Sequence, residues 1–298
     1  MMILKNLSKD KLGSLSLIMI TATIIVGLFP SFFAPHDPYE IKMNIRYGAS
    51  SSEYLMGNDH LGRCILSRLI YGIGPSVLWV LVALALSVVI GALLGFIAGY
   101  FRGKVDAFIM RICDVMLSFP LYVMTLAIVG ILGVGLENIL IAFIVMKWAW
   151  FARVIRTSVM QYSELDYVKF AKASGIRDSK IIYKHIIPVT FADIAVISSS
   201  AIGSMILQIS GFSFLGLGIQ APNAEWGMML NEAREVMFTR PELMLAPGLA
   251  IIIIVSTFNF LSDALQAALD PKLMTSTAAF HKHRVVSKIR VRNKEVTE

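Results

Sequence analysis

Charged residues are scarce in this sequence, and so is cysteine. Asp, Glu, Lys and Arg make up 16 % of the 298 residues, whereas apolar residues make up 56 % and the mean hydropathy is +0.71. So little charge cannot cover a water-soluble fold of this size, which predicts an integral membrane protein. The two cysteines, Cys64 and Cys113, lie in different segments and match no disulfide framework or metal-binding spacing.

Motifs for nucleotide binding and catalysis are also missing. Gly211, Gly216 and Gly218 are spaced like a phosphate-binding loop, but no Lys-Ser or Lys-Thr pair follows them. A membrane-embedded enzyme should cluster His, Asp, Glu or Ser at one depth, and no such cluster is visible. An ion-coupled secondary transporter usually needs carboxylates at mid-membrane. The candidates fall near predicted helix ends: Asp106, Asp114, Asp193 and Asp263. Both alternatives are disfavoured but stay open.

Six apolar segments reach the roughly 20 residues that span a bilayer. The first could be a cleaved signal peptide, but it is longer than a typical apolar core, and Pro35 follows Ala34 where cleavage would have to occur. The chain therefore divides into a cytoplasmic N-terminus (1–11), a first transmembrane helix (12–33), an extracytoplasmic loop with an interfacial helix (34–73), a core of five transmembrane helices (74–268) and a basic cytoplasmic tail (269–298).

Lys and Arg lie mainly on one side of these spans. Twenty of the 27 fall at the termini, at the turn near residue 103 and in the segment 153–184; six lie on the other side, and Lys147 lies within a span. By the positive-inside rule, both termini and the polar segment 163–188 face the cytoplasm. The net charge of +7 thus reflects orientation rather than nucleic-acid binding, and the basic tail suits anionic lipid.

Small residues and proline shape two of the spans. Gly91, Gly95 and Gly99 recur at every fourth residue of the second span, a stripe that lets another helix approach closely, although glycine is also simply tolerated in membrane helices. Pro120 predicts a bend in the third span, which is expected to run to about Gly133.

Charges inside the spans need partners. Arg111 and Asp114 are three residues apart on one helical face and are predicted to pair. Lys147 falls close to mid-membrane in the fourth span, where an unpaired cation costs roughly 2.5 to 3.5 kcal/mol. Lys147 is therefore a candidate for lining a solute pathway, and the alternative is that it pairs with a neighbouring subunit.

The polar segment from Ser163 to Pro188 interrupts two apolar segments and is too patterned for a linker. Ser163 and Asp166 have the S-x-x-D spacing of a helix N-terminus, and Gly175 is placed to adopt the left-handed conformation that ends such a helix. Asp178 or Ser179 can cap a second turn that leads to Pro188 at the start of the next span. The segment is predicted to form a helical hairpin outside the membrane.

This hairpin resembles the cytoplasmic loop of permease subunits of bacterial ABC importers, whose pattern is EAA, three residues, Gly, nine residues, I-x-L-P. Ala171, Gly175 and Pro188 match, and Ile187 replaces the leucine. The chain departs from the pattern at three positions: Lys169, Phe170 and His185. The resemblance implies a coupling helix that contacts a separate ATPase through Tyr167, Phe170, Ala171, Ala173, Ser174 and Gly175. An ordinary amphipathic surface helix is the alternative.

Three further runs resemble permeases for oligopeptides, dipeptides and nickel. The run YLMGNDHLGRCILSRLIYG is similar to LGTDxLGRDxLSRLIYG, SFLGLGIQAPNAEWGMML is similar to SFLGLGxQPPxPxWGxML, and FNFLSDALQAALDPKL is similar to NxxGDxLRDxLDP. His60 after Asp59 favours the nickel and metal-chelate members. A metal site at His60 is not expected, because only Asp59 lies beside it in sequence. The candidate contacts with a binding protein are Trp226, Gly227, Asp59 and His60.

The first of these runs also carries a helical pattern. Leu61, Cys64, Ile65 and Leu69 share one face, and Arg63 and Arg68 lie elsewhere, as in an interfacial helix.

Together the resemblances imply an all-α membrane protein with six transmembrane helices, the type I ABC importer permease architecture and a cytoplasmic coupling helix. Such a subunit sits in the bacterial inner membrane and forms half of the pathway with a second, similar permease. The implied partners are two cytoplasmic ATPases, which bind ATP and Mg²⁺ in place of this chain, and an extracytoplasmic substrate-binding protein. The implied solute is a nickel- or cobalt-type metal ion, a metal chelate, or else a di- or oligopeptide.

Overall fold

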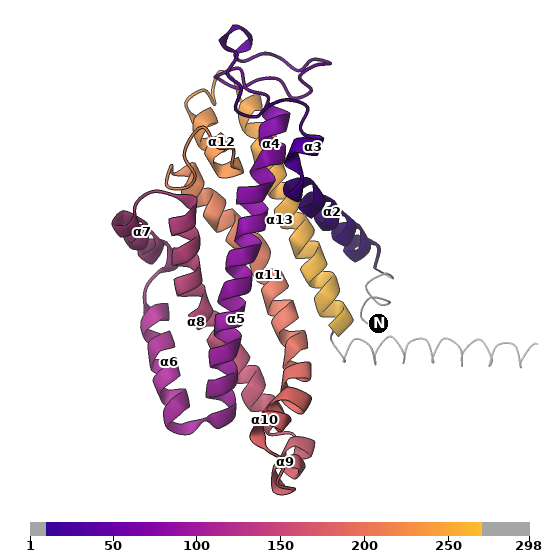
Figure 1. The fold of residues 1–298 in the computed structure, drawn as a ribbon, viewed down its shortest axis with the longest axis vertical. Coiled ribbons are helices and arrows are strands. Elements are labelled where there is room, and N and C mark those ends of the chain that lie inside the picture. Colours follow the sequence, from indigo (N-terminus) through magenta and orange to yellow (C-terminus); the bar gives the residue numbers. More distant parts are fainter. Residues whose placement is uncertain (1–9, 270–298) are drawn as a thin grey trace, which may run out of the picture.

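The computed structural model describes residues 10–269, which form an elongated helical bundle with no β-strand among them (Figure 1). The helices are α2 (Lys11–Leu28), α3 (Pro30–Phe33), η1 (Met43–Ile45), α4 (Ile65–Ile73), η2 (Gly74–Leu78), α5 (Trp79–Phe101), α6 (Gly103–Ser118), α7 (Leu121–Leu132), α8 (Leu136–Ser163), α9 (Asp166–Ala173), α10 (Asp178–Ile181), η3 (Ile182–Ile186), α11 (Ile187–Phe214), α12 (Trp226–Arg234) and α13 (Glu242–Leu269). The predicted all-α class is confirmed for the described part of the chain. The predicted basic tail and most of the predicted N-terminus lie outside it.

Five helical segments are long and apolar enough to cross a membrane, and the bent pair α6–α7 makes a sixth if it counts as one span. Two of these segments, 65–101 and 178–214, each run for 37 residues. At 1.5 Å per residue such a helix is about 55 Å long, well beyond the roughly 30 Å hydrocarbon core. Their ends therefore project from the membrane, α4 at one end of the bundle and α10 at the other (Figure 1).

Helices α5 and α8 pack closely along the glycine stripe. A Cβ atom added to Gly91 would lie 2.5 Å from the Cβ atom of Phe151, and one added to Gly95 would lie 2.7 Å from the carbonyl oxygen of Ala152. At Gly99 the corresponding distance to the carbonyl oxygen of Arg156 is 2.8 Å. The stripe is thus a helix contact, because no larger side chain fits between the two backbones.

The third predicted span is broken rather than gently bent. Helices α6 and α7 meet at 86° across Phe119 and Pro120, both of which have extended backbone conformations. Pro120 lacks an amide hydrogen and disfavours a helical conformation at the preceding residue, which explains why the helix ends there. The chain therefore turns at this point instead of continuing straight.

The predicted interfacial helix is not a separate element. Helix α4 continues through the π-helical turn η2, which contains Pro75, into α5. A π turn accommodates the missing proline amide without ending the helix. Arg63 and Arg68, which were predicted to lie off the apolar face, are nevertheless buried, with exposed fractions of 1 % and 0 %.

Ion pairs connect α6 to α8. Asp114 was predicted to pair with Arg111 but pairs with Arg153, and Asp106 pairs with Arg156.

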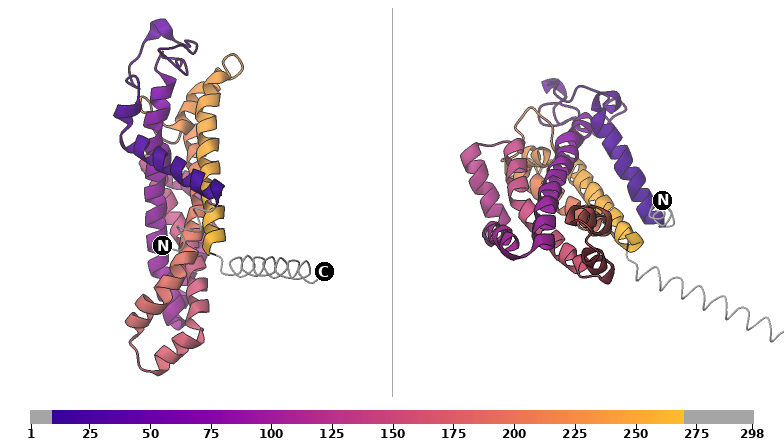
Figure 2. Two further views of the ribbon diagram at one scale, coloured as in Figure 1. Left: turned by 90° about the vertical axis from the view of Figure 1, so that its right-hand side faces the viewer. Right: turned by 60° about the horizontal axis from the view of Figure 1, so that its bottom comes forward.

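Helix α2 packs on another side of the bundle, where it lies across α13 (Figure 2). There Gly13 meets Ala264, where an added Cβ would lie 2.5 Å from the Cβ atom of the alanine.

Candidate functional site

The hairpin between α8 and α11 forms one end of the bundle (Figure 1). The predicted capping by Ser163 is wrong, because its hydroxyl donates to the carbonyl of Val159 (2.6 Å) and so belongs to the last turn of α8. Helix α9 begins at Asp166 without a side-chain cap. Gly175 has φ +74°, which confirms the predicted left-handed conformation after α9.

The inner face of the hairpin packs against its own chain. Val168 and Ile181 are fully buried, and so is Ile186 in η3. Ala171 is 5 % exposed, and its carbonyl accepts from the amide of Ile176 (3.2 Å). The small side chain of Ala171 therefore permits close packing within the hairpin, whereas a partner protein would meet the other face.

Three aromatic side chains of the hairpin are exposed. Phe170 and Tyr183 are 74 % and 78 % exposed, and Tyr167 is 44 % exposed. Ala173, Ser174 and Gly175 are exposed beside them. Aromatic side chains grouped at the tip of a protruding segment are typical of a protein contact surface.

Three contacts fasten the hairpin to the end of α5. The hydroxyl of Tyr100 donates to Asp178 (2.5 Å), and the ammonium group of Lys172 lies over the Tyr100 ring, 4.4 Å from its centre. Glu164 bridges Arg102 (2.6 Å) and Lys169 (3.0 Å). Hydrogen bonds from Lys169 and Arg102 lower the pKa of Glu164, so it stays charged at neutral pH. These contacts join the hairpin directly to the end of α5.

At the opposite end, a buried charge cluster ties α4 to α12. Arg63 donates to Asp59 (2.6 Å) and to Glu232 (2.9 Å), and Arg68 donates to Glu232 (3.0 Å). The two positive and two negative charges cancel within the cluster. Sequence reasoning missed it, because Glu232 lies more than 160 residues away and carries no motif.

Trp226 and Gly227 hold α12 in place. The indole nitrogen of Trp226 donates to the carbonyl of Leu69 (2.9 Å), and Gly227 packs against the backbone of Ser210. Glu225 is fully buried and accepts from the Gly227 amide and the Ser76 hydroxyl. Trp226 is only 4 % exposed, so it acts within this chain, and any effect on a binding protein would be indirect.

Asp59, His60 and Glu232 lie close enough to share a metal ion, with ligand atoms within 4.8 Å of one another. The second carboxylate, that of Glu232, comes from the distant helix α12 and was not predictable from the residues next to His60. Both carboxylates, however, are already hydrogen-bonded to the arginines of the buried cluster. The two carboxylates therefore stabilise the loop through the arginines, and little of their negative charge is left to bind a cation.

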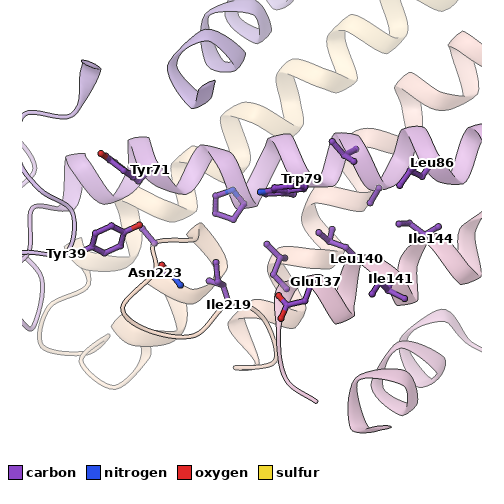
Figure 3. Close-up of a pocket in the computed structure, with 15 residues that line it drawn as sticks. Tyr39, Tyr71, Trp79, Leu86, Glu137, Leu140, Ile141, Ile144, Ile219 and Asn223 are labelled. Atoms are coloured by element: carbon purple, nitrogen blue, oxygen red, sulfur yellow. The ribbon is translucent and has the colours of Figure 1, made fainter. Parts of the chain in front are cut away.

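Two cavities lie along α8. The outer one, about 480 Å³, is bounded by α5, α8 and the loop 219–224, with Tyr39 and Tyr71 at one end and Glu137 beside Ile219 (Figure 3). The second, about 340 Å³, contains Lys147 and lies at the break between α6 and α7. The predicted position of Lys147 in a cavity wall thus agrees with the structure, while its role in transport stays a prediction.

Comparison with known proteins gives the family. Residues 91–275 match the family described as the binding-protein-dependent transport system inner membrane component. The chain belongs to this family. It is 60 % identical over 273 residues to the metal-staphylopine import system permease protein CntC of Staphylococcus aureus, an alignment covering 92 % of this chain and 94 % of that protein.

Two other relatives extend the comparison. The permease is 37 % identical over 264 residues to the nickel transport system permease protein NikC of Escherichia coli K12, covering 89 % of this chain and 95 % of NikC. It is 38 % identical over 269 residues to the dipeptide transport system permease protein DppC of Alkalihalophilus pseudofirmus, covering 90 % and 88 %. These matches confirm the predicted membership among ABC importer permeases of the oligopeptide, dipeptide and nickel type. The chain is therefore a multi-pass transport subunit of the membrane.

Proposed function

We propose that this permease forms half of the translocation pathway of an ATP-driven importer for a small metal chelate. The supporting observation is its 60 % identity to a metal-staphylopine permease across 92 % of the chain. A nickel-type ion or a dipeptide is the second candidate, because NikC and DppC are similar over nearly the same length at 37 and 38 % identity.

The energy for transport comes from partner subunits. The sequence contains no nucleotide-binding motif, so two cytoplasmic ATPases bind ATP and Mg²⁺. The exposed aromatic face of Tyr167, Phe170 and Tyr183 fits a groove on one of them. The Lys and Arg distribution supports a cytoplasmic position for this hairpin and both termini, on the side where ATP is found.

The remaining partners complete the pathway. A second permease covers the other half, and a substrate-binding protein docks on the extracytoplasmic side near Asp59 and His60. When ATP closes the ATPase pair, the hairpin moves with it and pulls α5 through the contacts of Tyr100 and Glu164. The helices then switch between inward-facing and outward-facing packings, which is alternating access by rigid-body motion.

Uptake by the full importer in vesicles tests this function. ⁶³Ni²⁺ with staphylopine, ⁶³Ni²⁺ alone and radiolabelled dialanine are offered as separate solutes, with ATP supplied or depleted while the membrane potential is held constant. We expect ATP-dependent uptake of the nickel–staphylopine complex. Uptake that continues without ATP would instead support an ion-coupled secondary transporter, and uptake of dialanine alone would support the second candidate.

A further inference from the structure

The cavity around Lys147 lies where the broken span exposes the interior of the bundle. Leu117 and Phe119 line it from the end of α6, and Leu121 lines it from the first position of α7. Helix α8 contributes Lys147, and α11 contributes Ser200 and Ser204. Leu84 of α5 completes the lining, so five helices converge on one cavity within the predicted membrane region.

Lys147 has no carboxylate partner among residues 10–269. The acidic side chains near this part of the bundle are engaged elsewhere, Asp114 with Arg153 and Asp106 with Arg156. A lysine in a membrane-spanning helix without a counter-charge is costly, and such residues generally mark a solute or ion pathway. The cavity thus offers a positive charge that an anionic group can satisfy.

The other polar groups at the cavity also favour an anionic ligand. The hydroxyls of Ser200 and Ser204 donate to helix carbonyls three residues earlier (3.0 and 2.9 Å), and they can rotate toward a stronger acceptor. Leu121, the first residue of the 12-residue helix α7, lines the same cavity, so the positive end of that helix dipole lies beside it. None of the residues that line the cavity is acidic.

We propose that Lys147, assisted by Ser200 and Ser204, binds a carboxylate group of the solute as it passes the break between α6 and α7. This rests on the proposed function and specifies the chemistry of its cargo. A deprotonated carboxylate is a common metal ligand, so a metal chelate can carry this group, and a dipeptide carries one at its C-terminus. The subsite therefore recognises a feature that a metal chelate and a dipeptide share and that a nickel-type ion lacks.

The test compares variants of the complete importer reconstituted in vesicles with its partner permease, ATPases and binding protein. Lys147→Met keeps the length of the side chain and removes the charge, and Lys147→Arg restores the charge. Lys104→Met is the matched control, because Lys104 is an exposed lysine at the start of α6 and does not line the cavity. The solutes are ⁶³Ni²⁺ complexed by staphylopine and, in a second arm, radiolabelled dialanine, and the ATP dependence of wild-type uptake is measured first.

A charge-assisted hydrogen bond to the solute predicts that Lys147→Met lowers uptake on the order of tenfold in the arm that the wild type transports. Lys147→Arg should retain most of the uptake, and the Ser200→Ala/Ser204→Ala double variant should lie between. The proposal is overturned if Lys147→Met transports as well as Lys104→Met, or if it releases the second permease during purification, which would mean that Lys147 pairs with that subunit. ATP-independent wild-type uptake would refute the proposed function itself, and wild-type uptake of neither solute would refute the solute class and this proposal with it.

Discussion

Phe170 offers the sharpest test of coupling, because its side chain is 74 % exposed in this subunit and contributes little to its fold. Phe170→Ala should change the free energy of unfolding by less than about 0.5 kcal/mol. Fully burying a phenylalanine contributes about 1.5 to 3 kcal/mol, so about three quarters of that, roughly 1 to 2 kcal/mol, is available for docking. We therefore expect the ATPases to bind this permease about 5- to 30-fold more weakly.

The assay is co-purification of the ATPases with the solubilised permease over a range of ATPase concentrations, followed by solute-stimulated ATP hydrolysis in vesicles. Phe238→Ala is the matched control, since Phe238 is 90 % exposed in the turn after α12, at the opposite end of the bundle. It should leave ATPase binding unchanged. Equal ATPase binding by the Phe170 and Phe238 variants would refute the assignment of the aromatic face as the docking surface.

Three other predictions follow from single contacts. Arg68→Ala should lower stability by about 3 to 5 kcal/mol, because it leaves the buried Glu232 partly unpaired, and a thermal unfolding midpoint equal to that of the wild type would refute the pairing. Gly95→Leu should reduce the yield of folded permease by separating α5 from α8, while Gly130→Leu, whose Cβ faces open space in α7, should be tolerated; equal yields would contradict the packing. Burial raises the pKa of Glu225 above its unfolded value, so stability should fall as pH rises through the raised pKa, and thermal unfolding of Glu225→Gln should lack that slope.

Local sequence patterns predicted the features that depend on a few neighbouring residues. The apolar segments follow from hydropathy and length, and Gly175 takes a positive φ because a residue without a Cβ atom is favoured after a helix end. The Gly91 stripe was recognisable because a four-residue spacing repeats on one helical face. In each case the physical cause lies within one or two helical turns.

Contacts between distant segments were not predictable in this way. Asp114 has Arg111 within its own helix, yet it pairs with Arg153 across to α8, because the fold places that guanidinium closer. Ser163 has the spacing of a helix cap, but its hydroxyl bonds to the carbonyl four residues earlier. A single sequence lists several acceptable partners for each polar group, and only the packing of the helices selects among them.

The continuous helix from Ile65 to Phe101 explains how the two ends of the permease can act together. Tyr100 at one end binds the hairpin through Asp178, and Arg68 at the other end binds α12 through Glu232. Both contacts belong to one 37-residue helix whose C-terminal third packs closely on α8 along the glycine stripe. We therefore expect a displacement of the hairpin to move α5 and α8 together. Replacing Tyr100 by Phe removes the hydroxyl that joins the hairpin to this helix. We expect this variant to bind the ATPases normally but to hydrolyse ATP with reduced uptake per ATP, and an unchanged ratio of uptake to hydrolysis would show that coupling takes another route.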